Sequence, residues 1–153
     1  MRKMKTGILY LALCICMLTG CSSSRTVSLT FKVGTGDNIK VTLDTSDGLG
    51  LSQTESGFSV TEDGNAVLQA FFVEQAVYQQ YMESVANQEG VTVNEQKSEE
   101  GITYLSYTYA GEAGVENNFI VWIEGSSTGV VIGSLSDLQT ATGAFQNISF
   151  SKE

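Results

Sequence analysis

The chain has 153 residues with 8 basic and 17 acidic side chains, and it contains no histidine. The negative field repels phosphate backbones and anionic lipid headgroups, which counts against nucleic-acid binding and against membrane docking through basic residues. Histidine is the commonest general base and the commonest transition-metal ligand. Its absence excludes serine-histidine, cysteine-histidine and zinc chemistry.

The chain starts with a basic head and an apolar run. Arg2, Lys3 and Lys5 precede residues 8–18, which are almost purely apolar. This run covers 11 residues, whereas a helix that spans a bilayer needs about 20, so the pattern predicts a signal segment. Residues 1–20 are expected to be a signal peptide that is removed.

The apolar run ends with Leu18, Thr19, Gly20 and Cys21. These residues resemble the lipobox of bacterial lipoproteins. The resemblance implies cleavage between Gly20 and Cys21 and a diacylglyceryl group on the Cys21 thiol. Because two acyl chains give stable membrane association, we expect an extracytoplasmic protein that the lipid on Cys21 anchors to the cell membrane. An ordinary secretory signal peptide is the alternative.

Removal of residues 1–20 leaves 133 residues, which is enough for one domain with its own core. Three basic residues leave with the signal, so 5 basic residues face 17 acidic ones and the net charge becomes −12. Cys14 and Cys16 leave as well, so the mature domain has no disulfide. Residues 21–26 are expected to form the lipidated tether and residues 27–153 a single α+β domain.

Hydrophobic periodicity divides this domain into strands and helices. The predicted strands are residues 27–33, 39–43, 57–61, 66–73, 91–97, 102–109, 119–124 and 130–134. Residues 44–50 and 110–117 are expected to be loops. The spacing changes to three and four in residues 74–87, which predicts the main helix.

A short C-terminal helix is predicted after Ser136, which is placed to cap it, because Leu138, Ala141, Phe145 and Ile148 repeat at helical spacing. The fold class is therefore α+β, an antiparallel meander flanked by a main helix and a short C-terminal helix. The initial hairpin, the helix and the closing FQNISF segment resemble the PsbP-like fold over roughly residues 38–150. That resemblance implies a sheet covered by helices and a role in assembly. The ion-binding histidines of the photosystem member of that family have no counterpart here.

The predicted meander has two apolar faces. If the loops at residues 110–117 and 125–129 are placed symmetrically between their strands, Tyr107 lies opposite Ile120 and Trp122 lies opposite Ile132. One face then carries Leu105, Tyr107, Tyr109, Ile120, Trp122 and Ile132, and the other Ile102, Tyr104, Phe119, Val121 and Ile123. Such a sheet is either buried under helices on both sides or leaves aromatic residues exposed for contact. Tyr107, Tyr109 and Trp122 are the candidate partner-binding residues.

The acidic loops do not match a known metal motif. Asp47 and Gly48 superficially resemble a calcium loop, but the spacing places Leu43 and Thr54 where carboxylates are required. No catalytic residue, metal ligand or cofactor site is assigned. The sequence predicts a non-catalytic binding or assembly module with a protein partner at the cell envelope. The alternative is a divalent-cation-binding or hydrolytic domain that uses loop carboxylates.

Overall fold

The computed structural model describes residues 25–153. The predicted signal peptide, its cleavage site at Gly20 and the lipidated Cys21 lie outside the described residues. The elements in chain order are β1 (Thr26–Lys32), β2 (Asn38–Asp44), β3 (Leu49–Gln53), β4 (Gly57–Glu62), β5 (Asn65–Glu74), α1 (Gln75–Asn87), β6 (Val91–Glu99), β7 (Ile102–Gly111), β8 (Gly114–Ile123), β9 (Thr128–Ser134), α2 (Leu138–Gln146) and β10 (Ile148–Lys152). In residues 25–153, neither helix has the length and apolar character needed to span a bilayer.

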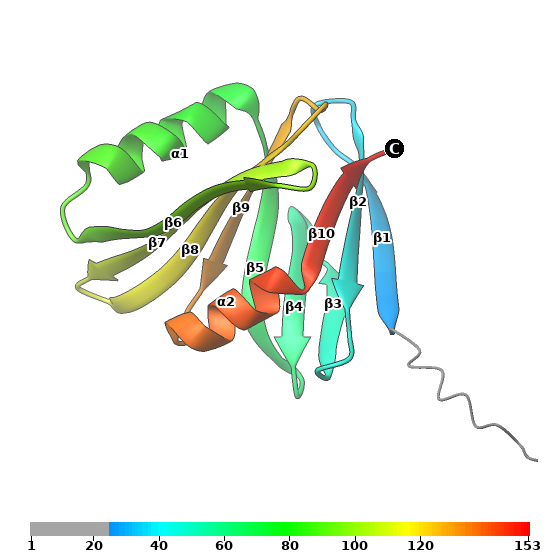
Figure 1. Cartoon of the computed structure of the whole chain (residues 1–153), viewed down its shortest axis with the longest axis horizontal. Helices are drawn as coiled ribbons and strands as arrows, with labels where there is room; N and C mark the ends of the chain where they lie inside the picture. Colours follow the sequence, from blue (N-terminus) through cyan, green and yellow to red (C-terminus); the bar gives the residue numbers. More distant parts are fainter. Residues whose placement is uncertain (1–24) are drawn as a thin grey trace, which may run out of the picture.

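The strands form two antiparallel sheets, which confirms the predicted fold class. The small sheet has the order β1-β2-β10, and the large sheet has the order β3-β4-β5-β9-β8-β7-β6. Helix α1 connects β5 to the edge strand β6 and lies on one face of the large sheet, here called the outer face (Figure 1). Helix α2 and the small sheet pack on the opposite inner face.

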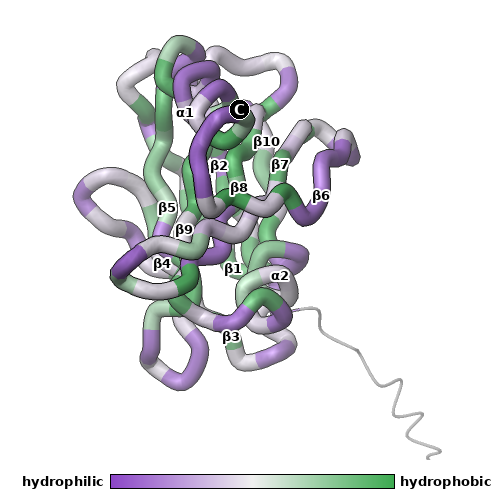
Figure 2. Tube along the Cα trace, turned by 90° about the vertical axis from the view of Figure 1, so that its left-hand side faces the viewer, coloured by the Kyte–Doolittle hydropathy of each residue, from purple (hydrophilic) through white to green (hydrophobic). Residues whose placement is uncertain are grey.

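The pleat of the large sheet sends alternate side chains to the two faces. Leu105 lies opposite Ile120, and both contact α1 through Val85. On the inner face, Phe119 stacks on Phe145 of α2 with ring centroids 4.2 Å apart. In Figure 2 the central strands are mostly hydrophobic, whereas the peripheral turns contain the most hydrophilic stretches.

The predicted loop at residues 110–117 is wrong, because β7 continues to Gly111 and β8 begins at Gly114. The tighter turn moves the β7-β8 register by two residues, which leaves the assigned faces unchanged. Strand β9 likewise begins earlier than predicted, and Trp122 lies opposite Gly129. The β8-β9 register therefore differs from the predicted one by an odd number of residues. As a result, Ile132 belongs to the inner face and not to the face of Trp122.

Two strands occupy positions where the sequence predicted other structure. Strand β3 overlaps the predicted loop at residues 44–50. Ile148 begins β10 and does not continue the last helix, because Ile148 and Phe150 are buried while Ser149 is exposed, a period of two. Asp137, and not Ser136, caps α2, since its Oδ1 accepts a hydrogen bond from the Thr140 amide at 2.9 Å.

Asp37, in the turn before β2, links the two sheets. Its Oδ2 accepts hydrogen bonds from the Ser127 amide at 2.7 Å and the Thr128 hydroxyl at 2.9 Å. Its Oδ1 lies 2.8 Å from Lys152 Nζ in β10. The bond to Lys152 is the largest cause that lowers the pKa of Asp37 from 3.8 to about 2, and the Ser127 amide is the next.

Because the pKa of Asp37 is lowered in the folded protein, we expect the domain to lose stability in acid. A native-state pKa of about 2 against an ordinary value of 3.8 means that the unfolded chain binds more protons between these values. The stabilisation is complete above the ordinary pKa and disappears as the pH falls from about 4 towards 2. Asp37→Asn is expected to lower the melting temperature by several degrees at pH 7 and to have a smaller effect at pH 2.5. Melting curves across this range test the prediction, and an equal loss at both pH values would contradict it.

Candidate functional site

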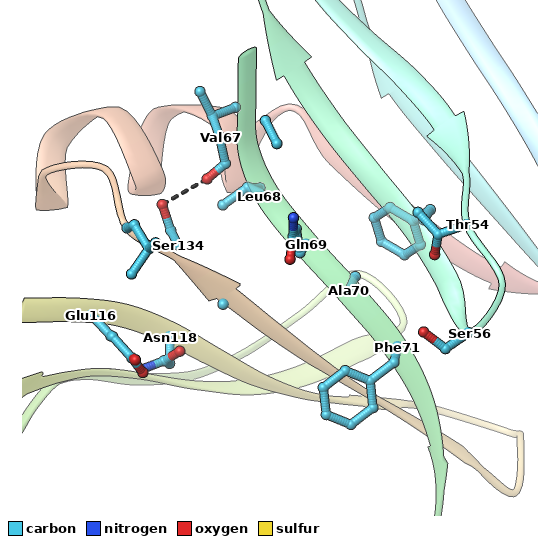
Figure 3. A pocket seen from close by; sticks show the side chains of 14 residues that line it. Thr54, Ser56, Val67, Leu68, Gln69, Ala70, Phe71, Glu116, Asn118 and Ser134 are labelled. Carbon is cyan, nitrogen blue, oxygen red and sulfur yellow. Dashed lines mark hydrogen bonds between the residues drawn. The ribbon is translucent and has the colours of Figure 1, made fainter. Parts of the chain in front are cut away.

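Helix α1 covers only part of the outer face. Its Tyr78, Tyr81 and Met82 pack around Leu105 and Ile120. Beyond the helix, β4, β5, β9 and β8 line a hollow of about 470 Å³, here called the outer-face hollow (Figure 3). The residues that line it include Thr54, Ser56, Gln69, Phe71, Glu116, Asn118, Gly133 and Leu135.

The strand register brings together the central residues of this hollow. Gln69 of β5 lies opposite Gly133 of β9, and Gly133 lies opposite Asn118 of β8. These three positions therefore share one face and form a row across the strands. Gly133 has no side chain between the two amides, and a Cβ added there would lie 3.2 Å from Asn118 Oδ1.

Asn118 is the most informative residue in this row. The residue is 8% exposed, and its side-chain amide makes no hydrogen bond to another residue in the range 25–153. The neighbouring Asn117 differs, since its Oδ1 accepts from the Thr108 hydroxyl at 2.8 Å and its Nδ2 donates to the Ser136 carbonyl at 2.8 Å. In the described part of the chain, every solvent-inaccessible side-chain nitrogen or oxygen atom has a hydrogen-bond partner. The Asn118 amide must therefore reach solvent, and it does so through the hollow.

The rim of the hollow is acidic and apolar. Glu116 is exposed at one side, and Leu135 is 86% exposed beside it. Phe71 is half-buried, with its ring centroid 6.2 Å from that of Tyr81 in α1. The basic side chains of residues 25–153 lie elsewhere, at Arg25, Lys32, Lys40, Lys97 and Lys152.

Two of the three predicted contact residues lie next to this hollow. Tyr107 is opposite Asn118, and Tyr109 is opposite Glu116. Burial is the main cause that raises the pKa of Tyr107, and Tyr81 and Glu116 add to it. All three aromatic residues are half-buried, so their role in binding a partner stays a prediction.

Trp122 lies away from Tyr107 and Tyr109. It packs on Tyr78 of α1 with ring centroids 5.0 Å apart. It lies four positions from Asn118 along β8, a span of about 13 Å along an extended strand. Trp122 is therefore not among the residues that line the hollow.

Sequence reasoning missed Gln69, Asn118 and Gly133. Two signals were available: a pair of asparagines enters the apolar stretch of β8, and a glycine interrupts the apolar stretch of β9. A glycine within a strand marks a close approach or an open space above the sheet. The row across three strands depends on the register, which the sequence alone did not provide.

The loop acids do not gather around a common centre in the described residues. Between residues 25 and 153, no group of three or more cysteine, aspartate or glutamate side chains is placed to hold a metal ion. The hydroxyl of Ser134 near the hollow donates to the Val67 carbonyl at 2.6 Å and accepts from the Ser136 amide at 3.1 Å. The polar side chains that line the hollow are therefore the two amides, the Glu116 carboxylate and the hydroxyls of Thr54, Ser56 and Ser134.

The fold and the hollow define a two-sheet antiparallel α+β domain with a partly covered outer face. No protein-family model matches the chain, and a search of curated proteins finds no match either. The function must therefore be argued from the residues of the site.

Proposed function

We propose that this chain is an extracytoplasmic lipoprotein, anchored to the membrane through Cys21, whose domain is a non-catalytic binding or assembly module. The outer-face hollow is its binding site. The observation that supports the hollow as the binding site is Asn118, a residue that is 8% exposed and whose side-chain amide makes no hydrogen bond within the described residues and opens into the hollow. Because this amide reaches solvent through the hollow, a ligand that displaces its water must offer matching hydrogen-bond groups, which makes the amide a determinant of what can bind.

The chemistry around the hollow favours binding over catalysis. Glu116 is the only acidic or basic side chain among the residues that line it in the described part of the chain. General acid-base catalysis needs a titratable group in reach of the reacting atom, and nucleophilic catalysis needs a base beside the nucleophile. Two amides, a single carboxylate and the hydroxyls of the lining serine and threonine residues provide hydrogen-bond donors and acceptors for recognition.

The lipid anchor predicts a complete change of location on one substitution. In a bacterial host, Cys21→Ser is expected to abolish incorporation of labelled palmitate and to release the mature domain from the membrane, because each buried methylene contributes about 0.8 kcal/mol to anchoring. Cys16→Ser is the matched control and keeps both label and location. If the Cys21→Ser variant still incorporates palmitate or stays stably on the membrane, the proposal that Cys21 carries the lipid anchor is wrong.

Binding at the hollow is tested in membranes that carry the anchored chain. Chemical cross-linking of the wild type is expected to give discrete adducts that Asn118→Ala abolishes or reduces severalfold. Asn38→Ala, which changes an exposed asparagine of the small sheet, is the control and keeps them. Melting curves establish that both variants are folded. Adducts that survive Asn118→Ala unchanged would exclude the hollow as the binding site.

A further inference from the structure

We propose that the outer-face hollow binds a basic peptide segment in extended conformation. This inference deepens the proposed function and rests on it. The peptide would lie across β5, β9 and β8, with main-chain groups on the amides of Gln69 and Asn118 and a cationic side chain at Glu116.

The first argument is the chemistry of the two amides. A primary amide side chain has a donor and an acceptor side by side, which matches the N-H and C=O groups of a peptide main chain. Asn118 has both groups free of partners within the described residues, and Gln69 is exposed in the same hollow. Gly133, which has no side chain, lies between the two amides and leaves both accessible to one ligand.

The second argument is spacing. Gln69 and Asn118 lie on strands separated by one intervening strand, so their backbones are about 10 Å apart. An extended peptide advances about 3.3 Å per residue, so three residues cover the same distance. One peptide can therefore contact both amides at once. Figure 3 shows that Gln69 and Phe71 come from β5 and that Glu116 and Asn118 come from β8.

The third argument is charge. Glu116 is the only charged side chain among the residues that line the hollow, and the basic residues of the described range belong to the small sheet, the segment before it and β6. The mature chain has a net charge of −12 by the count given above. A basic partner is attracted by this field, whereas an acidic one is repelled.

The shape of the site favours a chain over a compact ligand. The hollow lies on an open sheet face and crosses several strands, whereas small-molecule sites enclose most of their ligand. Phe71 and the exposed Leu135 supply apolar contacts for neighbouring peptide side chains. An alternating sequence of basic and apolar residues fits both features.

The test is a titration of the full chain, purified in a mild detergent, with a labelled hexapeptide of alternating lysine and valine, blocked at both ends. Fluorescence anisotropy measures the affinity. The wild type is expected to bind this peptide, and binding should weaken as salt is added. A matched peptide with glutamate in place of lysine is expected not to bind. Equal affinity for both peptides would overturn the inference.

Variants locate the binding. Asn118→Ala is expected to weaken binding about tenfold, the effect of losing roughly 1.4 kcal/mol of hydrogen bonding. Gln69→Ala, at an exposed position, keeps the test open if Asn118→Ala fails to fold, and it is expected to weaken binding severalfold. Glu116→Gln is expected to reduce the salt dependence. Asn38→Ala is the control with unchanged affinity, and wild-type affinity in both amide variants would overturn the site.

Three further outcomes separate this inference from the proposed function. Lysine amide that binds as tightly as the hexapeptide would show a site for small amines and overturn the peptide part. No peptide binding, together with membrane adducts that Asn118→Ala abolishes, would overturn the basic peptide and leave the hollow as a binding site. If neither peptide binding nor adducts depend on the hollow, both proposals fail.

Discussion

Phe58→Ala is expected to lower the free energy of unfolding by about 3–5 kcal/mol. Phe58 is fully buried between the sheets, and its ring centroid lies 6.1 Å from that of Phe31 and 6.0 Å from those of Phe72 and Phe150. Truncation leaves a cavity where four strands of the two sheets, β1, β4, β5 and β10, meet. Natural domains are stable by only about 5–15 kcal/mol, so this variant loses a large share of its stability.

Denaturant unfolding of the full chain measures the effect of Phe58→Ala. Val115→Ala is the matched control, because Val115 is 55% exposed near the β7-β8 turn and its truncation should change stability by less than about 0.5 kcal/mol. The two substitutions remove apolar groups from buried and exposed positions respectively. A loss below about 1 kcal/mol for Phe58→Ala would contradict the packing of the small sheet on the large one.

The strongly periodic segments could be predicted from the sequence. Apolar and polar side chains alternate along both strands of the first hairpin, and apolar side chains repeat every three or four residues in α1. Each element therefore has one consistent arrangement of its apolar side chains. The last segment was ambiguous. Ile148 fits helical spacing from Phe145 and also fits alternation with Phe150, and burial of Phe150 in the core selects the strand. Tertiary packing decides between the two periods there.

The register of the meander could be predicted only in part. Faces assigned to Tyr107 and Tyr109 were correct because the β7-β8 register moved by an even number of residues. The odd shift between β8 and β9 put Ile132 on the wrong face. The length of each turn sets the register of the strands it joins. A turn rich in glycine and serine is compatible with several lengths, so the sequence does not determine the register.

The outer-face hollow depends on the same register, which explains why sequence reasoning did not find it. Gln69, Gly133 and Asn118 are far apart in the chain and meet only through two successive strand pairings. Helix α1 lies on the outer face (Figure 1), where it packs on Leu105 and Ile120, and the hollow lies on the part that the helix leaves uncovered. Single-residue properties predict an aromatic surface at Tyr107, but they do not predict the polar row beside it.

Gly57→Ala is expected to destabilise the domain by about 1–3 kcal/mol through steric conflict within the large sheet. Gly57 begins β4 opposite Phe71. A Cβ at this position would clash with the Ala70 carbonyl oxygen and would lie 2.9 Å from Phe71 Cα, both of which are backbone atoms. The two strands would have to separate, which weakens their hydrogen-bonded pairing and disturbs the wall of the hollow that Phe71 forms.

Gly143→Ala provides the matched comparison. Gly143 lies within α2 at an exposed position, and no atom lies within 4 Å of an added Cβ. Alanine there is expected to raise stability by about 0.5–1 kcal/mol, because glycine loses more conformational freedom when a helix forms. Opposite signs for the same chemical change would show that backbone contact at Gly57, and not glycine flexibility, determines the cost. Equal stability of Gly57→Ala and the wild type would contradict the close approach of β4 to β5.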